Sequence, residues 1–334
     1  MPNPVFRSFR IGAYIVGTVT VRAPIYAVYQ APFGQKPKQR SGGIQLTYKN
    51  EVKIVESNGY KVMTCNGIPD HTVGQFPGTG NPNSIAPQSY IFRIKMNPTA
   101  APEGNQASSV GPQLFGVAIN GVVFDPGTAE LWNHNPAYRY EALSGAYGNG
   151  NMLGADENFA HVQPNGAYHY HGMPIGLLKK LDFKNKMALI GYAADGFPIY
   201  GNYGYSNPND ASSPLKQIKS SYRLKTGFRP GGPGGAYDGS FASDYTYNRE
   251  FGDLDDSNGR TGVTPEYPKG TYYYVVTEEY PFVPRKFKGT PDSSFLKQEG
   301  PGFGGPGQAA TTTVIYGVAG MVPADYLVSY LSLS

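Results

Sequence analysis

Along much of this chain, apolar and polar residues alternate over short segments, which is the period of a β-strand with one buried face. Val52–Ser57 and Tyr60–Cys65 are two such segments, and Asn58-Gly59 between them is a strong hairpin signal. Asn120-Gly121 and Asp195-Gly196 predict two further hairpins. Other predicted strands are residues 44–48, 90–96, 245–249 and 270–277. No segment has the 3.6-residue period of a helix of ordinary length, so we expect a mainly β fold, organised as one large sandwich-like or Greek-key domain.

The two ends of the chain differ from its middle. Residues 9–22 and 24–31 are strand-like, and a basic, glycine-containing connector follows them. Residues 11–21 have arginines before them, as in a short signal peptide, but their apolar residues alternate with tyrosine and threonine, so we expect a strand and no signal peptide. The last apolar blocks are 312–318 and 326–333. We predict an N-terminal β arm with a linker at 1–43, a β domain at 44–300 and a C-terminal β extension at 301–334.

Composition narrows the classes of function. Only 16% of the 334 residues are charged, the net charge is +4, and lysine and arginine form no cluster, which argues against a nucleic-acid partner. No apolar run approaches the ~20 residues that a membrane helix needs. Cys65 is the one cysteine, which excludes an intrachain disulfide and a cysteine-rich metal site, and its apolar neighbours predict a buried, unreactive thiol. The 27 tyrosines fit a packed aromatic core or a carbohydrate-binding surface.

Three of the five histidines lie in residues 161–171, on either side of a Pro-Asn-Gly turn. If Pro164, Asn165 and Gly166 form a three-residue loop, His161 pairs with His169 across a hairpin. Because side chains alternate along a strand, His171 then shares their face of the sheet. A loop of Asn165-Gly166 alone would instead send His161 to the opposite face. The register therefore decides whether the three imidazoles meet.

The segment at the end of this hairpin, Tyr168-His169-Tyr170-His171-Gly172, resembles the signature of the YHYH domain family. The resemblance extends over residues 44–292 through further blocks in the same order. These blocks are residues 66–71, 124–130, 140–143, 190–201 and 262–268. The resemblance implies the shared domain. Members of the family are often predicted to be exported, and this sequence departs from them in having no convincing export signal. The resemblance assigns no catalytic residue.

Three neighbouring imidazoles, joined by His71, would form the nitrogen-rich shell that suits zinc, copper or iron. Carboxylates would orient the rings or complete the shell, and the candidates are Asp70, Asp125, Glu141 and Asp195. Three histidines with an open position are typical of a catalytic site, and four ligands of a structural one. The alternative is a ladder in which Tyr168 and Tyr170 pack on one face while the histidines bond to carboxylates on the other.

A second candidate site is the acidic segment that begins at Asp253. An EF-hand calcium loop needs glycine at its sixth position and glutamate at its twelfth, where this sequence has Asn258 and Thr264. A calcium site of another kind would use Asp253, Asp255, Asp256 and Glu266. The alternative is a solvated acidic turn.

Two classes of function follow from these features. In the first, the chain is a structural or surface-assembly protein, for example a phage virion component, whose terminal β arms add strands to neighbouring subunits. In the second, it is a metal-dependent hydrolytic or oxidative enzyme with the three clustered histidines as ligands. No Gly-x-Ser-x-Gly nucleophile motif supports covalent catalysis. We expect the assembly class with a structural metal, an extracellular or virion-surface location, and copies of the chain or other assembly subunits as partners.

Overall fold

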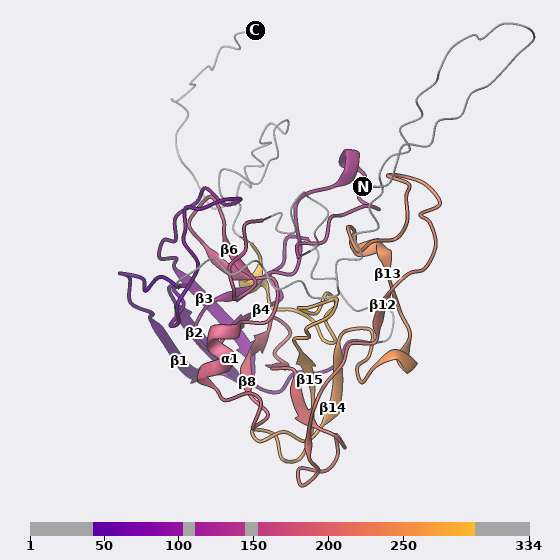
Figure 1. Ribbon diagram of the computed structural model, residues 1–334. Coiled ribbons are helices and arrows are strands. Elements are labelled where there is room, and N and C mark those ends of the chain that lie inside the picture. Colours follow the sequence, from indigo (N-terminus) through magenta and orange to yellow (C-terminus); the bar gives the residue numbers. More distant parts are fainter. Residues whose placement is uncertain (1–42, 103–110, 144–152, 298–334) are drawn as a thin grey trace, which may run out of the picture.

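The computed structural model describes residues 43–102, 111–143 and 153–297. The strands expected at 9–22, 24–31, 312–318 and 326–333 lie outside these residues, as do both predicted extensions except residue 43. The described part of the chain is mainly β, as the alternating pattern predicted. Its helices are all short (Figure 1). They are α1 (Ile175–Lys180) and the 3-10 turns η1 (Trp132–His134), η2 (Ala242–Asp244), η3 (Arg249–Phe251) and η4 (Ser293–Phe295).

The largest element within the described residues is a mixed eight-stranded sheet. In spatial order its strands are β14 (Gly259–Gly262), β15 (Thr271–Val275), β9 (Pro198–Tyr200), β8 (Leu189–Ala193), β4 (Gly116–Ala118), β5 (Val123–Phe124), β7 (Tyr168–Tyr170) and β6 (Ala160–Val162). The pairs β15–β9 and β5–β7 are parallel, and the others are antiparallel. The edge formed by β5, β7 and β6 contains the histidine-rich hairpin.

A three-stranded antiparallel sheet of β1 (Val52–Ser57), β2 (Tyr60–Cys65) and β3 (Tyr90–Lys95) packs on the larger one. Met63 and Phe92 of this sheet belong to the same buried core as Val117 and Ile190 of the eight-stranded sheet. This shared core makes the fold sandwich-like, as expected.

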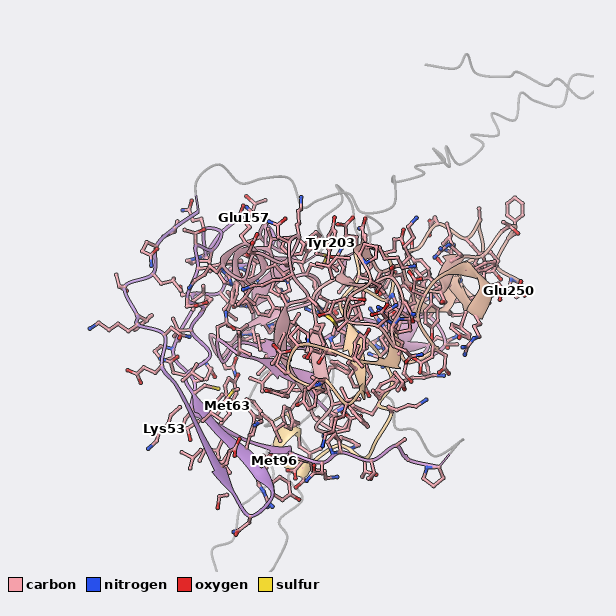
Figure 2. The ribbon with its side chains drawn as sticks, turned by 90° about the horizontal axis from the view of Figure 1, so that it is seen from below. Lys53, Met63, Met96, Glu157, Tyr203 and Glu250 are labelled. Carbon is pink, nitrogen blue, oxygen red and sulfur yellow. The ribbon has the colours of Figure 1, made fainter. Side chains whose placement is uncertain are left out.

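Two small sheets complete the fold and lie away from β1, β2 and β3. They are β10 (Tyr203–Tyr205) with β11 (Leu215–Gln217), and β12 (Tyr222–Leu224) with β13 (Tyr245–Tyr247). Figure 2 shows Lys53 of β1 at one side of the molecule and Glu250, just after β13, at the other. A smaller buried core that includes Tyr200, Ile218 and Tyr273 supports this second region.

The Asn-Gly and Asp-Gly pairs predicted the positions of the hairpins correctly. β1 and β2 have the expected bounds and pair from Ser57 with Tyr60, around Asn58-Gly59. Gly121 and Gly196 also lie in turns, with φ of 81° and 97°, which glycine adopts at low cost. All three predicted hairpins are therefore confirmed.

Weaker patterns predicted local structure less well. The expected strand at 44–48 is reduced to one bridge between Ile44 and Val73. Residues 132–134 form the short 3-10 turn η1, which no pattern in the sequence predicted. Helix α1 was not predicted, because six residues are too few to display a helical period, although it buries Leu177 and Leu178. No helix among the described residues is long and apolar enough to cross a membrane.

Candidate metal centre

The β6–β7 hairpin has the register predicted from its turn. Gln163 and Ala167 close a loop of Pro164, Asn165 and Gly166, with a hydrogen bond of 3.0 Å from the Gln163 N–H to the Ala167 carbonyl. Gly166 has φ of 87°, the left-handed conformation that this loop requires. His161 is consequently the direct partner of His169. The alternative two-residue loop, which would turn His161 to the other face, is excluded.

A third strand contributes to the same face of the sheet. β5 runs parallel to β7, and Val123 is the partner of His169. The N–H of Asp125 continues the ladder with a hydrogen bond of 3.0 Å to the Tyr170 carbonyl. Because residues alternate between faces, Val123 and Asp125 lie on the histidine side of the sheet.

Here the structure brings three imidazoles together. One ring nitrogen each from His161, His169 and His171 lies within 4.8 Å of the others. The Nε2 atoms of His169 and His171 are 2.9 Å apart. His161 is 9% exposed, His169 1% and His171 2%, so the cluster is screened from bulk water. No other group of three histidine, cysteine or carboxylate side chains with this geometry occurs in residues 43–102, 111–143 and 153–297.

Hydrogen bonds from the backbone orient two of the rings. Nδ1 of His169 is 3.2 Å from the Ala167 carbonyl, and Nδ1 of His161 is 3.1 Å from the Leu153 carbonyl. A carbonyl can only accept, so Nδ1 of His169 donates its proton, and the lone pair on its Nε2 faces Nε2 of His171 at 2.9 Å. Nδ1 of His161 also lies 3.0 Å from the amide nitrogen of Asn81, a donor that is fixed by a 2.9 Å hydrogen bond to the Val162 carbonyl, so the neighbours of this ring accommodate either tautomer. This is how outer residues hold metal-binding imidazoles.

Two buried polar atoms on this face have no hydrogen-bond partner among the described residues. They are Nδ1 of His171 and Oδ1 of Asp125. The other carboxylate oxygen of Asp125 pairs with the Lys297 ammonium at 2.8 Å. An unpaired buried polar atom costs roughly 1–3 kcal/mol, so two beside one cluster indicate a site that takes up an ion or water.

Burial keeps the imidazoles neutral. It lowers the pKa of His169 from 6.5 to about 4. The pKa values of His161 and His171 are held well below 6.5, first by burial and then by the neighbouring imidazoles. Burial also raises the pKa of Asp125, against the opposing effect of Lys297. At neutral pH the cluster therefore presents unprotonated nitrogens, which is the form that binds metal ions.

His71, expected as a fourth ligand, does not join the cluster. It lies on the opposite face of β7, where its Nε2 is 2.6 Å from the Tyr170 hydroxyl and its Nδ1 is 2.8 Å from the Thr72 carbonyl. Since the Thr72 carbonyl takes the Nδ1 proton, Nε2 accepts from Tyr170 and has no lone pair left for a metal.

Of the four carboxylates expected around the histidines, only Asp125 lies on their face. Asp70 is on the tyrosine side, where it pairs with Lys180 and accepts 3.0 Å from the Asn120 amide. Glu141 forms a buried ion pair with Arg285. Asp195 accepts from the Tyr274 hydroxyl at 2.6 Å. These three carboxylates orient other parts of the core.

The four carboxylates of the predicted calcium site form no group with the geometry to hold a metal ion among the described residues. Three of them pair with different lysines: Asp253 with Lys216, Asp256 with Lys286 and Asp255 with Lys288. The fourth, Glu266, accepts 2.6 Å from the Tyr200 hydroxyl. Each carboxylate therefore has a cation or hydroxyl of its own.

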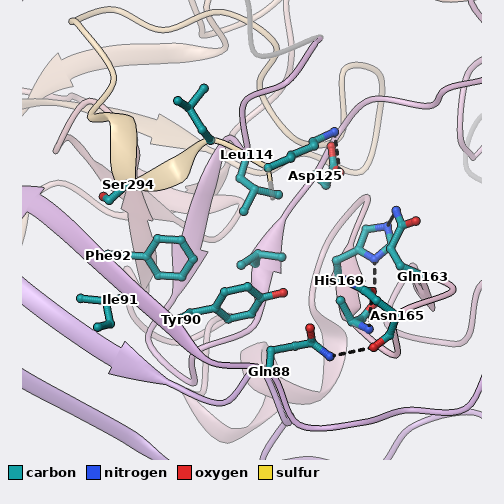
Figure 3. A pocket seen from close by; sticks show the side chains of 14 residues that line it. Gln88, Tyr90, Ile91, Phe92, Leu114, Asp125, Gln163, Asn165, His169 and Ser294 are labelled. Atoms are coloured by element: carbon teal, nitrogen blue, oxygen red, sulfur yellow. Dashed lines mark hydrogen bonds and ion pairs between the residues drawn. The ribbon is translucent and has the colours of Figure 1, made fainter. Parts of the chain in front are cut away.

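A cavity of about 100 Å³ adjoins the histidines (Figure 3). His169 and Gln163 stand on one side of it, and the Gln163 amide nitrogen is 3.5 Å from Nε2 of His169. Tyr90 points its hydroxyl toward that side. Apolar side chains form much of the remaining wall, and they are Ile91, Phe92, Leu114, Val123, Ala167 and Leu296. Of the three clustered histidines, only His169 lines this cavity.

Three residues of this centre were not predicted. Asn81 lies in a long irregular stretch, and Lys297 is far from Asp125 in sequence, so no local pattern connects either with the hairpin. Gln163 lies between β6 and the predicted loop, and its side chain was assigned no role. It follows His161 by two positions, so the alternation of the extended chain was the available signal.

The comparison with protein families identifies the family of this chain. The family model described as YHYH protein matches residues 91–289, more than half of the chain. The chain belongs to the YHYH family. The matched range contains the hairpin with all three clustered histidines, whereas the block at 66–71 with His71 lies outside it. No curated protein and no solved structure matches the chain.

Proposed function

We propose that this YHYH domain binds a divalent transition-metal ion through His161, His169 and His171. The observation that carries the proposal is the convergence of three buried, neutral imidazoles within 4.8 Å on one sheet face. Oδ1 of Asp125, a buried carboxylate oxygen on the same sheet face, has no hydrogen-bond partner among the described residues and leaves an acceptor for water or an ion beside the cluster.

The distance between His169 and His171 fits such an ion with little movement, and His161 lies close enough to complete the set after a larger adjustment. Zinc–nitrogen bonds of 2.0–2.1 Å in a tetrahedron place two ligand nitrogens about 3.3 Å apart. The Nε2 atoms of His169 and His171 are 2.9 Å apart, so the rings need to separate by only a few tenths of an ångström. The hydrogen bond from Nδ1 of His169 to the Ala167 carbonyl already directs the Nε2 lone pair of this ring away from the backbone.

The ligand set favours zinc, copper or iron, because imidazole suits these metals and no thiolate is present in the cluster. Three protein ligands leave a fourth position, and the cavity beside His169 gives access to it. A metal held this way supplies a polarising charge that makes bound water acidic or serves as a redox centre. The proposal therefore favours metal-dependent hydrolytic or oxidative chemistry on a small molecule.

Metal content of the full-length protein tests this function. After loading with zinc, copper or iron and removal of free metal, mass spectrometry should find about one ion per wild-type chain. His169→Ala/His171→Ala should retain almost none. His134→Ala is the matched control, since this exposed histidine of η1 lies outside the cluster and its loss should leave the metal content unchanged.

A wild-type protein that takes up no metal would overturn the proposal, as would retention of metal by the double variant. Near-ultraviolet circular dichroism should show that the double variant keeps its packed core. His161→Gln, which retains a polar side chain of similar reach, gives a second variant in case the double one does not fold.

We also propose self-assembly by strand addition, which β1 supports. This strand forms one edge of its sheet, so one side of its backbone has no strand partner among the described residues. Five of its six residues are exposed, among them Ile54 at 43% and Val55 at 48%. An uncovered apolar edge is the usual acceptor for a strand from another chain, such as the predicted arm at 1–43.

Light scattering of the full-length chain tests assembly. Deleting residues 1–43 should reduce an oligomer to monomers, and so should Ile54→Lys/Val55→Lys, because edge lysines oppose strand addition. Lys53→Gln is the control on the same strand. A monomeric wild type, or an oligomer unchanged in both variants, would contradict the assembly role.

A further inference from the structure

The open side of the histidine cluster has the features of a binding site for a small organic anion. We propose that the cavity receives a short-chain carboxylate, one oxygen of which binds the metal and accepts a hydrogen bond from the Gln163 amide. Its apolar body lies against Phe92, Leu114 and Val123. This inference rests on the proposed metal function and names the ligand class of that site.

The charges around the cavity favour an anion. Three neutral imidazoles leave the charge of a divalent ion uncompensated. Asp125 is the nearest carboxylate that lines the cavity, and Lys297 neutralises it at 2.8 Å. Arg285, whose charge also acts on His171, is paired with Glu141. The charged groups described around the cavity therefore neutralise one another. A bound metal ion would add positive charge that they do not balance, and an anionic ligand would balance it.

Gln163 supplies the specific contact. Its amide nitrogen lies 3.5 Å from Nε2 of His169, the atom that would hold the metal. Once that lone pair is used by an ion, the amide needs another acceptor nearby. An oxygen bound to the same ion is within its reach, and a hydrogen bond to a charged oxygen is stronger than one to a neutral group. The hairpin bond from Gln163 to Ala167 fixes the backbone from which this side chain extends.

The size and lining of the cavity limit the rest of the ligand. A volume of about 100 Å³ is smaller than the roughly 150 Å³ apolar cavity that accepts benzene. Tyr90 and Phe92 stack with ring centroids 5.3 Å apart and form one wall, and Leu114 and Leu296 extend the apolar lining. A carboxylate with three or four carbons fills such a space without placing a polar group against the apolar wall.

Cobalt-substituted full-length protein tests this inference, because the visible absorption of Co²⁺ reports on its ligands. Butyrate should change the wild-type spectrum saturably, and butyramide, its neutral counterpart, should leave it unchanged. Gln163→Leu should weaken butyrate binding about tenfold or more while cobalt stoichiometry stays the same. Gln217→Leu makes the same change on β11, outside the cavity lining, and should bind butyrate like wild type.

The outcomes separate this inference from the metal function. A protein that binds no cobalt overturns the metal site and the anion site together. A cobalt spectrum that butyrate does not alter overturns the anion site alone, and equal responses to butyrate and butyramide overturn its preference for charge. If Gln163→Leu does not fold, Gln163→Asn shortens the amide and should show a weaker loss. Unchanged affinity in every Gln163 variant would exclude the proposed hydrogen bond.

Discussion

The two faces of β7 contain alternating residues of one short strand, yet they differ in how their polar groups are satisfied. On the tyrosine face, the Tyr168 hydroxyl donates 2.7 Å to Asp156, and Tyr170 lies 2.6 Å from His71 and 3.0 Å from Asn120. On the histidine face, buried atoms of His171 and Asp125 have no partner within the described chain.

This difference assigns different tasks to the two kinds of residue. A fully bonded polar network inside a low-dielectric core rigidifies the structure around it. An incompletely bonded one has capacity for a ligand. The tyrosines therefore fix the strand in place, and the histidines use that fixed strand to present three nitrogens. The comparison predicts that changes on one face should alter stability and changes on the other should alter metal affinity.

The largest effect is expected from His171→Ala on metal affinity. Four-ligand zinc sites bind with roughly 10–16 kcal/mol, or about 3–4 kcal/mol per ligand, so losing one ligand should weaken binding several hundredfold. Isothermal titration calorimetry of the metal-free wild type and of the metal-free variant measures this loss of affinity. A loss below about tenfold would show that His171 is not a ligand.

A second effect concerns the histidine face and the way in which the free energy of unfolding depends on pH. The pKa of His169 is about 4 in the folded chain and about 6.5 when unfolded, so the unfolded state binds more protons as pH falls below 6.5. The stabilisation is complete above pH 6.5 and is lost on acidification toward pH 4. The loss from this ring amounts to about 3 kcal/mol, at 1.36 kcal/mol for each pKa unit.

Urea denaturation of the metal-free protein between pH 7 and pH 4.5 measures this dependence. His169→Gln, which cannot titrate, should show a shallower slope over the same range. Parallel slopes in the two proteins would mean that His169 is not the buried neutral ring described above.

The smallest effect belongs to the tyrosine face. Tyr170→Phe removes one hydroxyl and takes one hydrogen bond each from His71 and Asn120, which should cost about 1–3 kcal/mol of unfolding free energy. Metal affinity should change less than threefold, because the ring and the strand remain. Chemical denaturation and metal titration of the same sample check both statements. A large loss of affinity with unchanged stability would reverse the assignment of the two faces.

The sequence predicted this centre where local chemistry determines geometry. Pro164-Asn165-Gly166 fixes the hairpin register, and strand alternation then places three imidazoles together. Asn58-Gly59 likewise fixes where β1 ends and β2 begins, and so how the two strands pair. In each case the responsible residues are adjacent in the chain.

Prediction failed where the contact depends on tertiary structure. His71 is in an irregular stretch whose path over the sheet has no local signal, so its position on the tyrosine face was not foreseeable. The acidic residues after Asp253 resembled a calcium loop, but lysines distant in sequence pair with three of the four carboxylates. The counter-ion of Asp125 is 172 positions away, at Lys297.

The three-residue loop of the β6–β7 hairpin also defines a pattern by which similar centres can be recognised in other chains. It places the second and third histidines eight and ten positions after the first, with Pro-Asn-Gly at the third to fifth positions after it. Inserting or deleting one residue in the loop would rotate His161 to the opposite side while leaving the tyrosine–histidine tetrapeptide intact. The tetrapeptide alone is therefore a poor guide to metal binding, and the distance to the preceding histidine is the more informative part of the motif.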